Sequence, residues 1–198
     1  MSRVILASKS TARAQLLACA GVKFETVSSG VDEDAAKLEL LAECATPREI
    51  AGVLAELKAV AVSAASPGAL VIGADQTLDF GGRLFDKALT LQEAEQRLRL
   101  LCGRSHELHA AVVVAEDGAV IWRATETAAL HMRPFTDAFL SGYLERNADD
   151  VLSSVGCYRL EGEGVQLFDR IDGDYFTILG LPMLGLLDLL REHGVLES

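Results

Sequence analysis

The sequence has little of what marks several large classes of protein. Its 198 residues include four cysteines, none of which forms a CxxC pair or stands at zinc-ligand spacing from a histidine. Lysine and arginine number only 18 against 29 acidic residues, which gives a formal net charge of −11. Because proteins that grip nucleic-acid phosphates normally present a basic surface, this balance argues against DNA or RNA as a partner. No apolar run approaches the ~20 residues of a membrane-spanning helix, which argues against a membrane partner.

The start of the chain, MSRVILASKS, lacks the basic segment and the following apolar segment of a secretory signal. We therefore expect a cytoplasmic, reduced protein whose cysteines are small buried thiols. Half of the residues are hydrophobic and 24% are charged, as in globular proteins. The length predicts a single domain over residues 1–198, or such a domain with a smaller lobe formed by about residues 104–135.

Short β-branched runs alternate with capped amphipathic segments, which is typical of an α/β fold. Thr46–Glu49 and Thr90–Glu93 are both capping boxes. The predicted elements are strands at Arg3–Ala7, Leu70–Gly73, Glu107–Ala115 and Ala119–Met132, and helices at Ala12–Ala20, Thr46 to about Ala65, Thr90 to about Gly103, Thr136 to about Asn147 and Pro182–His193. The pattern predicts an elongated mixed sheet flanked by helices, with a cleft where loops gather at strand ends.

The segment from Ser8 to Arg13 joins the first strand to the first helix. Backbone N–H groups at the helix start, the hydroxyls of Ser8 and Ser10 and the guanidinium of Arg13 can together hold an anion such as a phosphate. The alternative is that Ser10 only caps the helix. The glycines of a P-loop or of GxGxxG are absent, which argues against a Rossmann-like cofactor domain.

Acidic and basic side chains elsewhere supply the other candidates. Asp75 follows the predicted strand Leu70–Gly73, where it can bind a metal or activate water, or simply serve as a cap or turn residue. Glu33 lies in the acidic run 31–34, which is a solvated loop unless it folds over the sheet and lets Glu33 share a divalent ion with Asp75. Lys58 and Lys87 are candidate counter-charges, although a lone lysine is most often a surface residue.

Taken in order, these segments resemble the Maf proteins, nucleoside-triphosphate pyrophosphatases named for an association with septum formation. The resemblance runs from residue 6 to residue 182 and covers nearly the whole chain. Its matches are Leu6–Ser10 with Arg13, Val31–Glu33, Glu56–Ala59, Gly73–Gln76, Lys87, the glycines of Gly156–Gly164, Gly173–Tyr175 and Gly180–Pro182. No single motif is decisive, but the ordered set is highly specific.

The resemblance implies a two-lobed α/β fold around a central cleft, often as a homodimer. It also implies Mg²⁺- or Mn²⁺-dependent hydrolysis of a nucleotide between its α- and β-phosphates. Asp75 would accept the proton of the attacking water, and the residues around the phosphates and the metal would be Ser8, Arg13, Glu33, Lys58 and Lys87. The rival hypothesis from another class is a nucleotide-binding regulator of cell division that does not cleave.

Three positions bear on which nucleotide is bound. Maf proteins that act on dTTP and UTP have arginine, threonine and glutamine where this chain has Ala12, Gln76 and Glu161. Gln76 and Glu161 look more like the branch that acts on 7-methyl-GTP, and Ala12 matches neither branch. A carboxylate at Glu161 can accept hydrogen bonds from N1–H and the exocyclic amine of guanine. We therefore expect a purine nucleotide, with a dTTP/UTP pyrophosphatase as the alternative.

Overall fold

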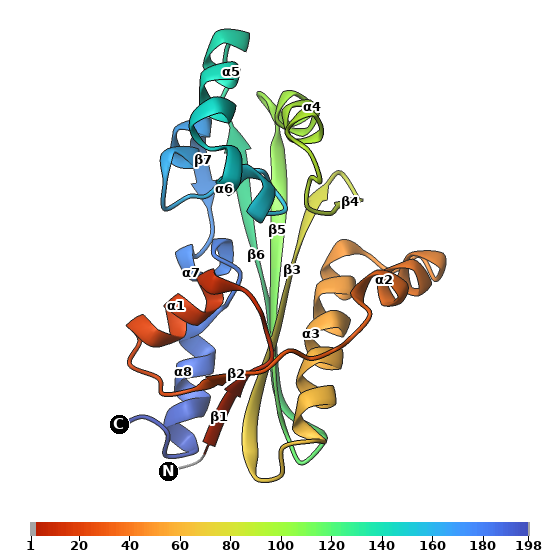
Figure 1. Cartoon of the computed structure of the whole chain (residues 1–198), viewed down its shortest axis with the longest axis vertical. Helices are drawn as coiled ribbons and strands as arrows, with labels where there is room; N and C mark the ends of the chain where they lie inside the picture. Colours follow the sequence, from red (N-terminus) through yellow and green to blue (C-terminus); the bar gives the residue numbers. More distant parts are fainter. Residues whose placement is uncertain (1–2, 198) are drawn as a thin grey trace.

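The computed structural model describes residues 3–197, whose strands form one seven-stranded mixed sheet (Figure 1). The strands are β1 (Arg3–Leu6), β2 (Glu25–Thr26), β3 (Ala69–Phe80), β4 (Arg83–Phe85), β5 (Ser105–Glu116), β6 (Ala119–Met132) and β7 (Phe168–Asp172). Their order is β2-β1-β3-β5-β6-β7, and β4 pairs with β3. β1 runs parallel to β2 and β3, while the other pairs are antiparallel. The predicted α/β class with an elongated mixed sheet is confirmed.

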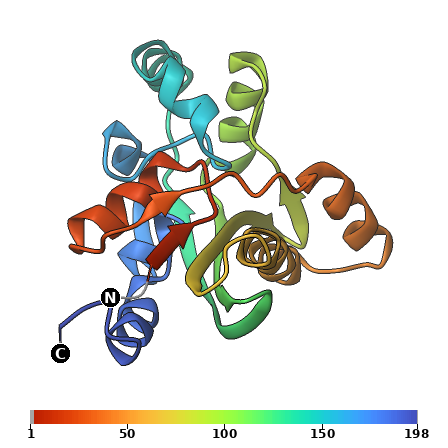
Figure 2. The same ribbon diagram turned by 60° about the horizontal axis from the view of Figure 1, so that its bottom comes forward.

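Helices cover both faces of this sheet. They are α1 (Thr11–Cys19), α2 (Glu33–Ala42), α3 (Pro47–Ser63), α4 (Leu91–Leu101), α5 (Asp137–Arg146), α6 (Ala148–Ser153), α7 (Tyr175–Ile178) and α8 (Met183–Glu192), with a 3₁₀ turn η1 (Glu163–Leu167). α3 packs on one face, and α1 and α8 pack on the other (Figure 2). Toward the far end of the long strands, α4, α5 and α6 enclose a second core around Leu98, Leu130 and Tyr143. Two groups of helices therefore lie along one sheet.

Local signals explain the helix starts. The Thr46 hydroxyl accepts from the Glu49 N–H and the Glu49 carboxylate accepts from the Thr46 N–H, so the first predicted capping box is confirmed. At the second, Thr90 accepts from the Glu93 N–H, but the Glu93 carboxylate bonds the Leu89 N–H instead of closing the box. The prediction of a reciprocal box was wrong there, although the helix begins where expected.

Three other predictions are corrected. The predicted strand Leu70–Gly73 extends to Phe80, because β5 pairs with β3 from Val71 to Asp79. The acidic run 31–34 is only in part a loop, since the Asp32 carboxylate accepts from the Ala35 N–H and caps α2, which contains Glu33 and Asp34. The prediction of four buried thiols was also wrong, because Cys19 and Cys44 are exposed.

β1 and β4 pair with the same edge of β3, and the stretch of β3 between them is unpaired. β1 pairs with β3 up to Ile72, and β4 joins at Leu78. Residues 73–77 of β3 thus lie between two strands that do not meet. Because successive side chains of a strand point to opposite faces, Asp75 faces α3 and Gln76 faces α7. A mid-strand position for Asp75, rather than the predicted strand end, gives it access to this opening.

The hairpin of β5 and β6 belongs to the central sheet, since β5 pairs with both β3 and β6. A smaller lobe at about residues 104–135 stays a prediction, as does a single domain over 1–198.

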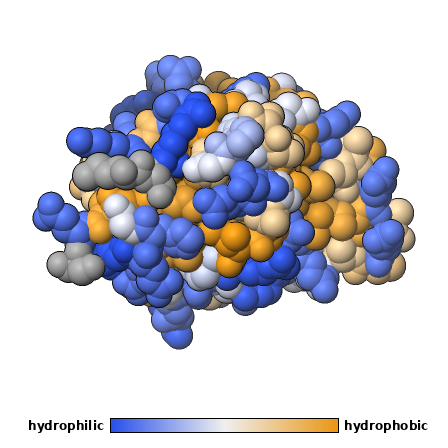
Figure 3. Space-filling view, turned by 90° about the horizontal axis from the view of Figure 1, so that it is seen from below, coloured by the Kyte–Doolittle hydropathy of each residue, from blue (hydrophilic) through white to orange (hydrophobic). Residues whose placement is uncertain are grey.

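Seen from the end away from α4–α6, apolar surface is interspersed with hydrophilic side chains (Figure 3). Across residues 3–197, no helix combines the length and apolarity that crossing a membrane requires.

Candidate functional site

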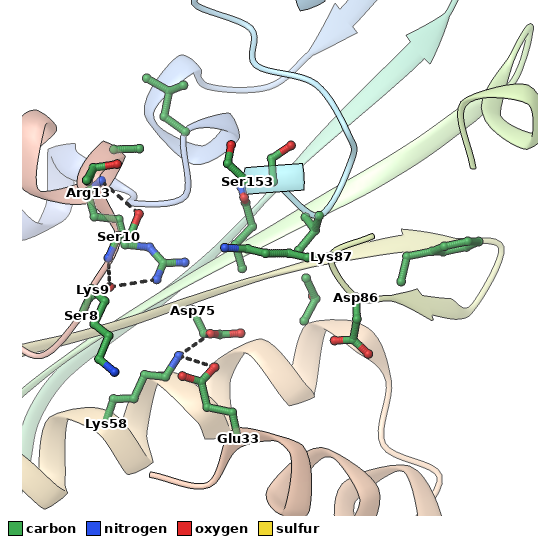
Figure 4. A pocket seen from close by; sticks show the side chains of 18 of the residues that line it. Ser8, Lys9, Ser10, Arg13, Glu33, Lys58, Asp75, Asp86, Lys87 and Ser153 are labelled. Atoms are coloured by element: carbon green, nitrogen blue, oxygen red, sulfur yellow. Dashed lines mark hydrogen bonds and ion pairs between the residues drawn. The ribbon is translucent and has the colours of Figure 1, made fainter. Parts of the chain in front are cut away.

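A cleft of about 990 Å³ opens where the edge of β3 is unpaired. Its lining is drawn from both ends of the chain and includes each of the ten residues singled out in the sequence: Ser8, Ser10, Ala12, Arg13, Glu33, Lys58, Asp75, Gln76, Lys87 and Glu161. Figure 4 shows Lys58 and Glu33 meeting Asp75 from one side, while Lys87 reaches in from the other. The structure brings these residues together, and the role of each stays a prediction.

A close approach between α3 and β3 forms the floor of the cleft. A Cβ atom on Gly73 would lie 2.2 Å from the Ala55 carbonyl oxygen and 2.5 Å from the Ala59 nitrogen, so only glycine fits against the α3 backbone. Lys58 precedes Ala59 on α3, and Asp75 is two residues beyond Gly73 on the same face of β3. The close packing therefore sets Lys58 beside Asp75.

Lys58 joins two carboxylates. Its ammonium lies 2.7 Å from Asp75 Oδ1 and 2.8 Å from Glu33 Oε2. Lys58 is 5% exposed and Asp75 is 7% exposed, whereas the Glu33 side chain is 41% exposed at the mouth of the cleft. Buried charges are costly unless they are paired, so the ammonium stabilises the Asp75 carboxylate in this position.

The same carboxylates can hold a divalent metal ion. Both approach one ammonium nitrogen within 2.8 Å, so their oxygens converge on a single region of the cleft. Carboxylate oxygens are the hard ligands that Mg²⁺ and Mn²⁺ accept, usually together with water and substrate phosphates. The donor set therefore fits such an ion, which Glu33 and Asp75 could hold.

Arg13 forms one wall of the cleft. Its Nε donates to the Gly180 carbonyl at 2.8 Å, and its Nη1 donates to the Ala74 carbonyl at 2.8 Å and to Ser8 Oγ at 3.3 Å. The bond to Ala74 satisfies a carbonyl on the unpaired part of β3. Burial lowers the pKa of Arg13, while the charges of Asp75 and Glu33 oppose that shift. Nη2 makes no hydrogen bond within residues 3–197, so it can donate to an anion.

The two serines differ in their contacts. Ser8 is 8% exposed, and its hydroxyl accepts from the Ser10 N–H at 3.2 Å as well as from Arg13. Ser10 caps α1, since its hydroxyl accepts from the Arg13 N–H at 3.4 Å. The capping alternative for Ser10 is thus present in the structure, and its hydroxyl proton is still available to a ligand.

Lys87 lies on the loop between β4 and α4, across the cleft from Asp75 (Figure 4). Burial lowers the pKa of its ammonium, and the nearby positive charges of Arg13 and Lys58 act in the same direction, against Glu33 and Asp75. Its ammonium has no hydrogen bond or ion pair in the part of the chain that the structure describes. A cation without a partner in a cleft is suited to bind an anion.

The sequence analysis missed Lys37, which also lines the cleft. Its ammonium lies 2.7 Å from Asp86 Oδ1 and 3.8 Å from Asp34 Oδ1. Burial lowers the pKa of Lys37, but the hydrogen bond and the charge of Asp86 outweigh it, and the net shift is upward. Had α2 been recognised from its Asp32 cap, the i, i+4 spacing of Glu33 and Lys37 would have placed both on one face.

Gln76 and Glu161 both form hydrogen bonds to other residues of the chain. The Gln76 amide donates to the carbonyls of Thr177 and Ile178, both at 2.9 Å, and so ties β3 to α7. Glu161 Oε1 accepts from Arg159 Nε at 3.0 Å and Nη2 at 2.9 Å, and Arg159 in turn contacts Asp150. Glu161 is thereby held at the cleft wall by Arg159.

Known proteins with similar sequences identify the family of this chain. Residues 3–193 match the family model described as Maf-like protein. The chain is 64% identical over 196 residues to a nucleoside triphosphate pyrophosphatase of Caulobacter vibrioides, covering 99% of this chain and 98% of that one. It is 49% identical to a 7-methyl-GTP pyrophosphatase of Rhizobium etli and 46% identical to one of Brucella abortus, each with 99% of this chain and 98% of the relative covered. The chain belongs to the Maf family.

Proposed function

We propose that the cleft hydrolyses a nucleoside triphosphate between its α- and β-phosphates and releases the nucleoside monophosphate and diphosphate. The observation that carries this proposal is the Lys58–Asp75–Glu33 cluster on the floor of a cleft that is lined by Arg13 and Lys87. Cleavage of a phosphoanhydride requires an oriented water and neutralisation of charge. The relatives named nucleoside triphosphate pyrophosphatase support the assignment.

Asp75 would act as the general base. Its Oδ1 is held by Lys58, and Oδ2 has no hydrogen bond within residues 3–197. Water would attack the α-phosphorus, its proton would pass to Asp75 Oδ2, and the bond from the α-phosphorus to the bridging oxygen would break, so that diphosphate leaves with the bonding electrons. Lys58 orients the carboxylate for this transfer.

The cations of the cleft would bind the phosphates. Arg13 Nη2 and the Ser8 hydroxyl lie at one wall, and the Lys87 ammonium enters from the opposite side (Figure 4). Charge-assisted hydrogen bonds to phosphate oxygens are stronger than neutral ones. A divalent ion, Mg²⁺ or Mn²⁺, held by Glu33 and Asp75 would neutralise further charge on the triphosphate.

The base is proposed to be a purine, with 7-methyl-GTP as the candidate nucleotide. Two relatives that bear this name are 46% and 49% identical to the chain. Glu161 Oε2 is free of hydrogen bonds among the described residues and can accept from a guanine edge, while Arg159 holds Oε1. Ala12 and Gln76 line the same cleft. A dTTP/UTP pyrophosphatase is the alternative.

A panel of nucleotides tests the activity. The panel includes GTP, 7-methyl-GTP, dTTP and UTP. Purified protein with Mg²⁺ or Mn²⁺ should release equal amounts of diphosphate and nucleoside monophosphate from at least one of these nucleotides. Binding of a nucleotide without diphosphate release would instead identify the non-catalytic regulator. A homodimer and a link to septum formation stay predictions from the family resemblance, and a cytoplasmic location stays a prediction from the sequence.

A further inference from the structure

A second group of candidate metal ligands lies on the same face of the sheet as Asp75. Asp79 on β3 stands directly opposite Glu107 on β5, and Thr77 stands opposite His109. Two carboxylates at facing cross-strand positions repel each other, which destabilises a sheet unless a cation lies between them. Within residues 3–197, the only basic side chain that contacts either carboxylate is His109.

His109 points its Nε2 atom at both carboxylates without forming a hydrogen bond. Nε2 lies 3.6 Å from Asp79 Oδ2 and 3.6 Å from Glu107 Oε2, too far for a hydrogen bond to either. The three atoms lie within 4.8 Å of one another. The His109 residue is only 4% exposed, and its Nε2 lies between the two carboxylates.

We propose that Asp79, Glu107 and His109 bind a divalent transition-metal ion such as Zn²⁺. Ligand atoms ~2.0–2.2 Å from a tetrahedral ion stand about 3.4 Å from one another, close to the two separations of 3.6 Å. Mg²⁺ and Ca²⁺ prefer oxygen alone, whereas an imidazole with carboxylates suits Zn²⁺. Asp79 and Glu107 also line a cavity of about 330 Å³, although His109 does not.

The surroundings of His109 support this assignment. Its Nδ1 lies 2.9 Å from Thr127 Oγ1, which also accepts from Arg48 Nη1 at 2.6 Å. Imidazoles that bind metal through one nitrogen usually hold a polar partner with the other, which fixes the ring. Asp79 Oδ1 is likewise fixed by the Gly82 N–H, at 2.6 Å, which leaves Oδ2 for the ion.

This site is distinct from the catalytic cleft. Asp79 is four residues beyond Asp75 along β3, which is ~13 Å at the rise of a strand. The cleft residues that would hold the catalytic ion are carboxylates only, whereas this site contains a nitrogen ligand. An ion bound here would link β3 to β5 and stabilise the folded state, since unfolding would separate its ligands. The inference does not depend on the proposed hydrolysis.

Nitrogen NMR of the histidine rings tests the proposal on metal-stripped protein labelled with ¹⁵N-histidine. One equivalent of ZnCl₂ should shift the His109 Nε2 resonance and raise Tm. Glu107→Gln, whose side chain is 52% exposed in the wild type, should weaken Zn²⁺ binding at His109 at least tenfold. His131→Gln is the matched control, because His131 faces only one carboxylate, that of Asp169, and this variant should keep the response.

Two further measurements separate a metal site at His109 from metal binding in the catalytic cleft and from a plain ion pair. Glu33→Gln should leave the Zn²⁺ response of His109 intact, and its loss would assign the ion to the catalytic cleft and overturn the proposal. Without metal, Glu107→Gln should raise Tm because it removes a like-charge contact. A lower Tm, together with an unchanged His109 resonance on Zn²⁺ addition, would show that a protonated His109 pairs with the two carboxylates and would contradict a metal site.

Discussion

Asp75 and Asp79 share one strand and one face of the sheet, yet they have different partners. Asp75 is 7% exposed and is paired with the ammonium of Lys58, 2.7 Å away. Asp79 is opposed by Glu107, and the nearest basic atom is the imidazole nitrogen of His109 at 3.6 Å. The first carboxylate has a lysine as its counter-charge and faces an open cleft, whereas the second faces another carboxylate and has no lysine or arginine partner among residues 3–197. The two aspartates therefore differ in role because the side chains around them differ, although they share a strand.

The largest expected effect comes from removing the charge of the first aspartate. Asp75→Asn should lower kcat by at least about 10³-fold, since general-base catalysis contributes ~10²–10⁴-fold and the amide is also a poorer metal ligand. Diphosphate release measured at saturating nucleotide checks this. Asp169→Asn, an exposed carboxylate on β7, is the control that should keep wild-type turnover. Turnover by Asp75→Asn near the wild-type rate would reject its assigned role.

Removing the counter-charge should be the largest effect on stability. Lys58→Met leaves Asp75 buried without its ion pair, which should lower the free energy of unfolding by about 3–5 kcal/mol. Urea denaturation measures the change. The double variant Lys58→Met with Asp75→Asn should recover part of the loss, because the amide needs no counter-charge. A double variant that is no more stable than Lys58→Met would show that lost packing, and not the unpaired charge, causes the effect.

The close approach that sets Lys58 beside Asp75 can be tested at Gly73. Gly73→Ala would place a methyl group 2.2 Å from the Ala55 carbonyl oxygen, and overpacking of this kind should cost ~1–3 kcal/mol or more in unfolding free energy. Gly52→Ala is the matched control on α3, where a Cβ meets only Thr125 Oγ1 at 3.8 Å. That variant should be as stable as the wild type or more so, because alanine favours a helix. Equal stability of the two variants would contradict the packing argument.

Lys87 should show a smaller effect, confined to binding. Lys87→Gln should raise KM about tenfold, since one charged hydrogen bond contributes ~1.5–3 kcal/mol. The lowered pKa of Lys87 means that its ammonium loses its proton at a lower pH than an ordinary lysine does. The wild-type kcat/KM should therefore fall on the alkaline side, and Lys87→Arg should abolish that fall because arginine stays charged. An identical pH profile for Lys87→Arg would assign the fall to another group.

The smallest effect is expected at Glu161. Glu161→Gln should lower the preference for guanine over uracil by up to about tenfold, because an amide can both donate to and accept from uracil. Competition assays with GTP, 7-methyl-GTP and UTP measure this preference. An unchanged preference would remove Glu161 from base selection and leave its contact with Arg159 as its only role.

Local signals in the sequence predicted most of the helices, because a cap such as Thr46 with Glu49 is made within a few residues. The length of β3 was missed, since it depends on pairing with β5, which lies about thirty residues further along the chain. Asp75 was therefore expected at a strand end. The approach of Asp79, Glu107 and His109 was not predicted, because it follows from the register between two strands. Lys37 was not predicted to line the cleft, because the acidic run was interpreted as a loop and not as the start of α2.

The most direct test of the proposed chemistry is hydrolysis in water enriched in ¹⁸O, followed by mass spectrometry of the two products. If water attacks the α-phosphorus beside Asp75, one ¹⁸O atom should appear in the nucleoside monophosphate and none in the diphosphate. Label in the diphosphate, or release of single phosphate in place of diphosphate, would contradict the account.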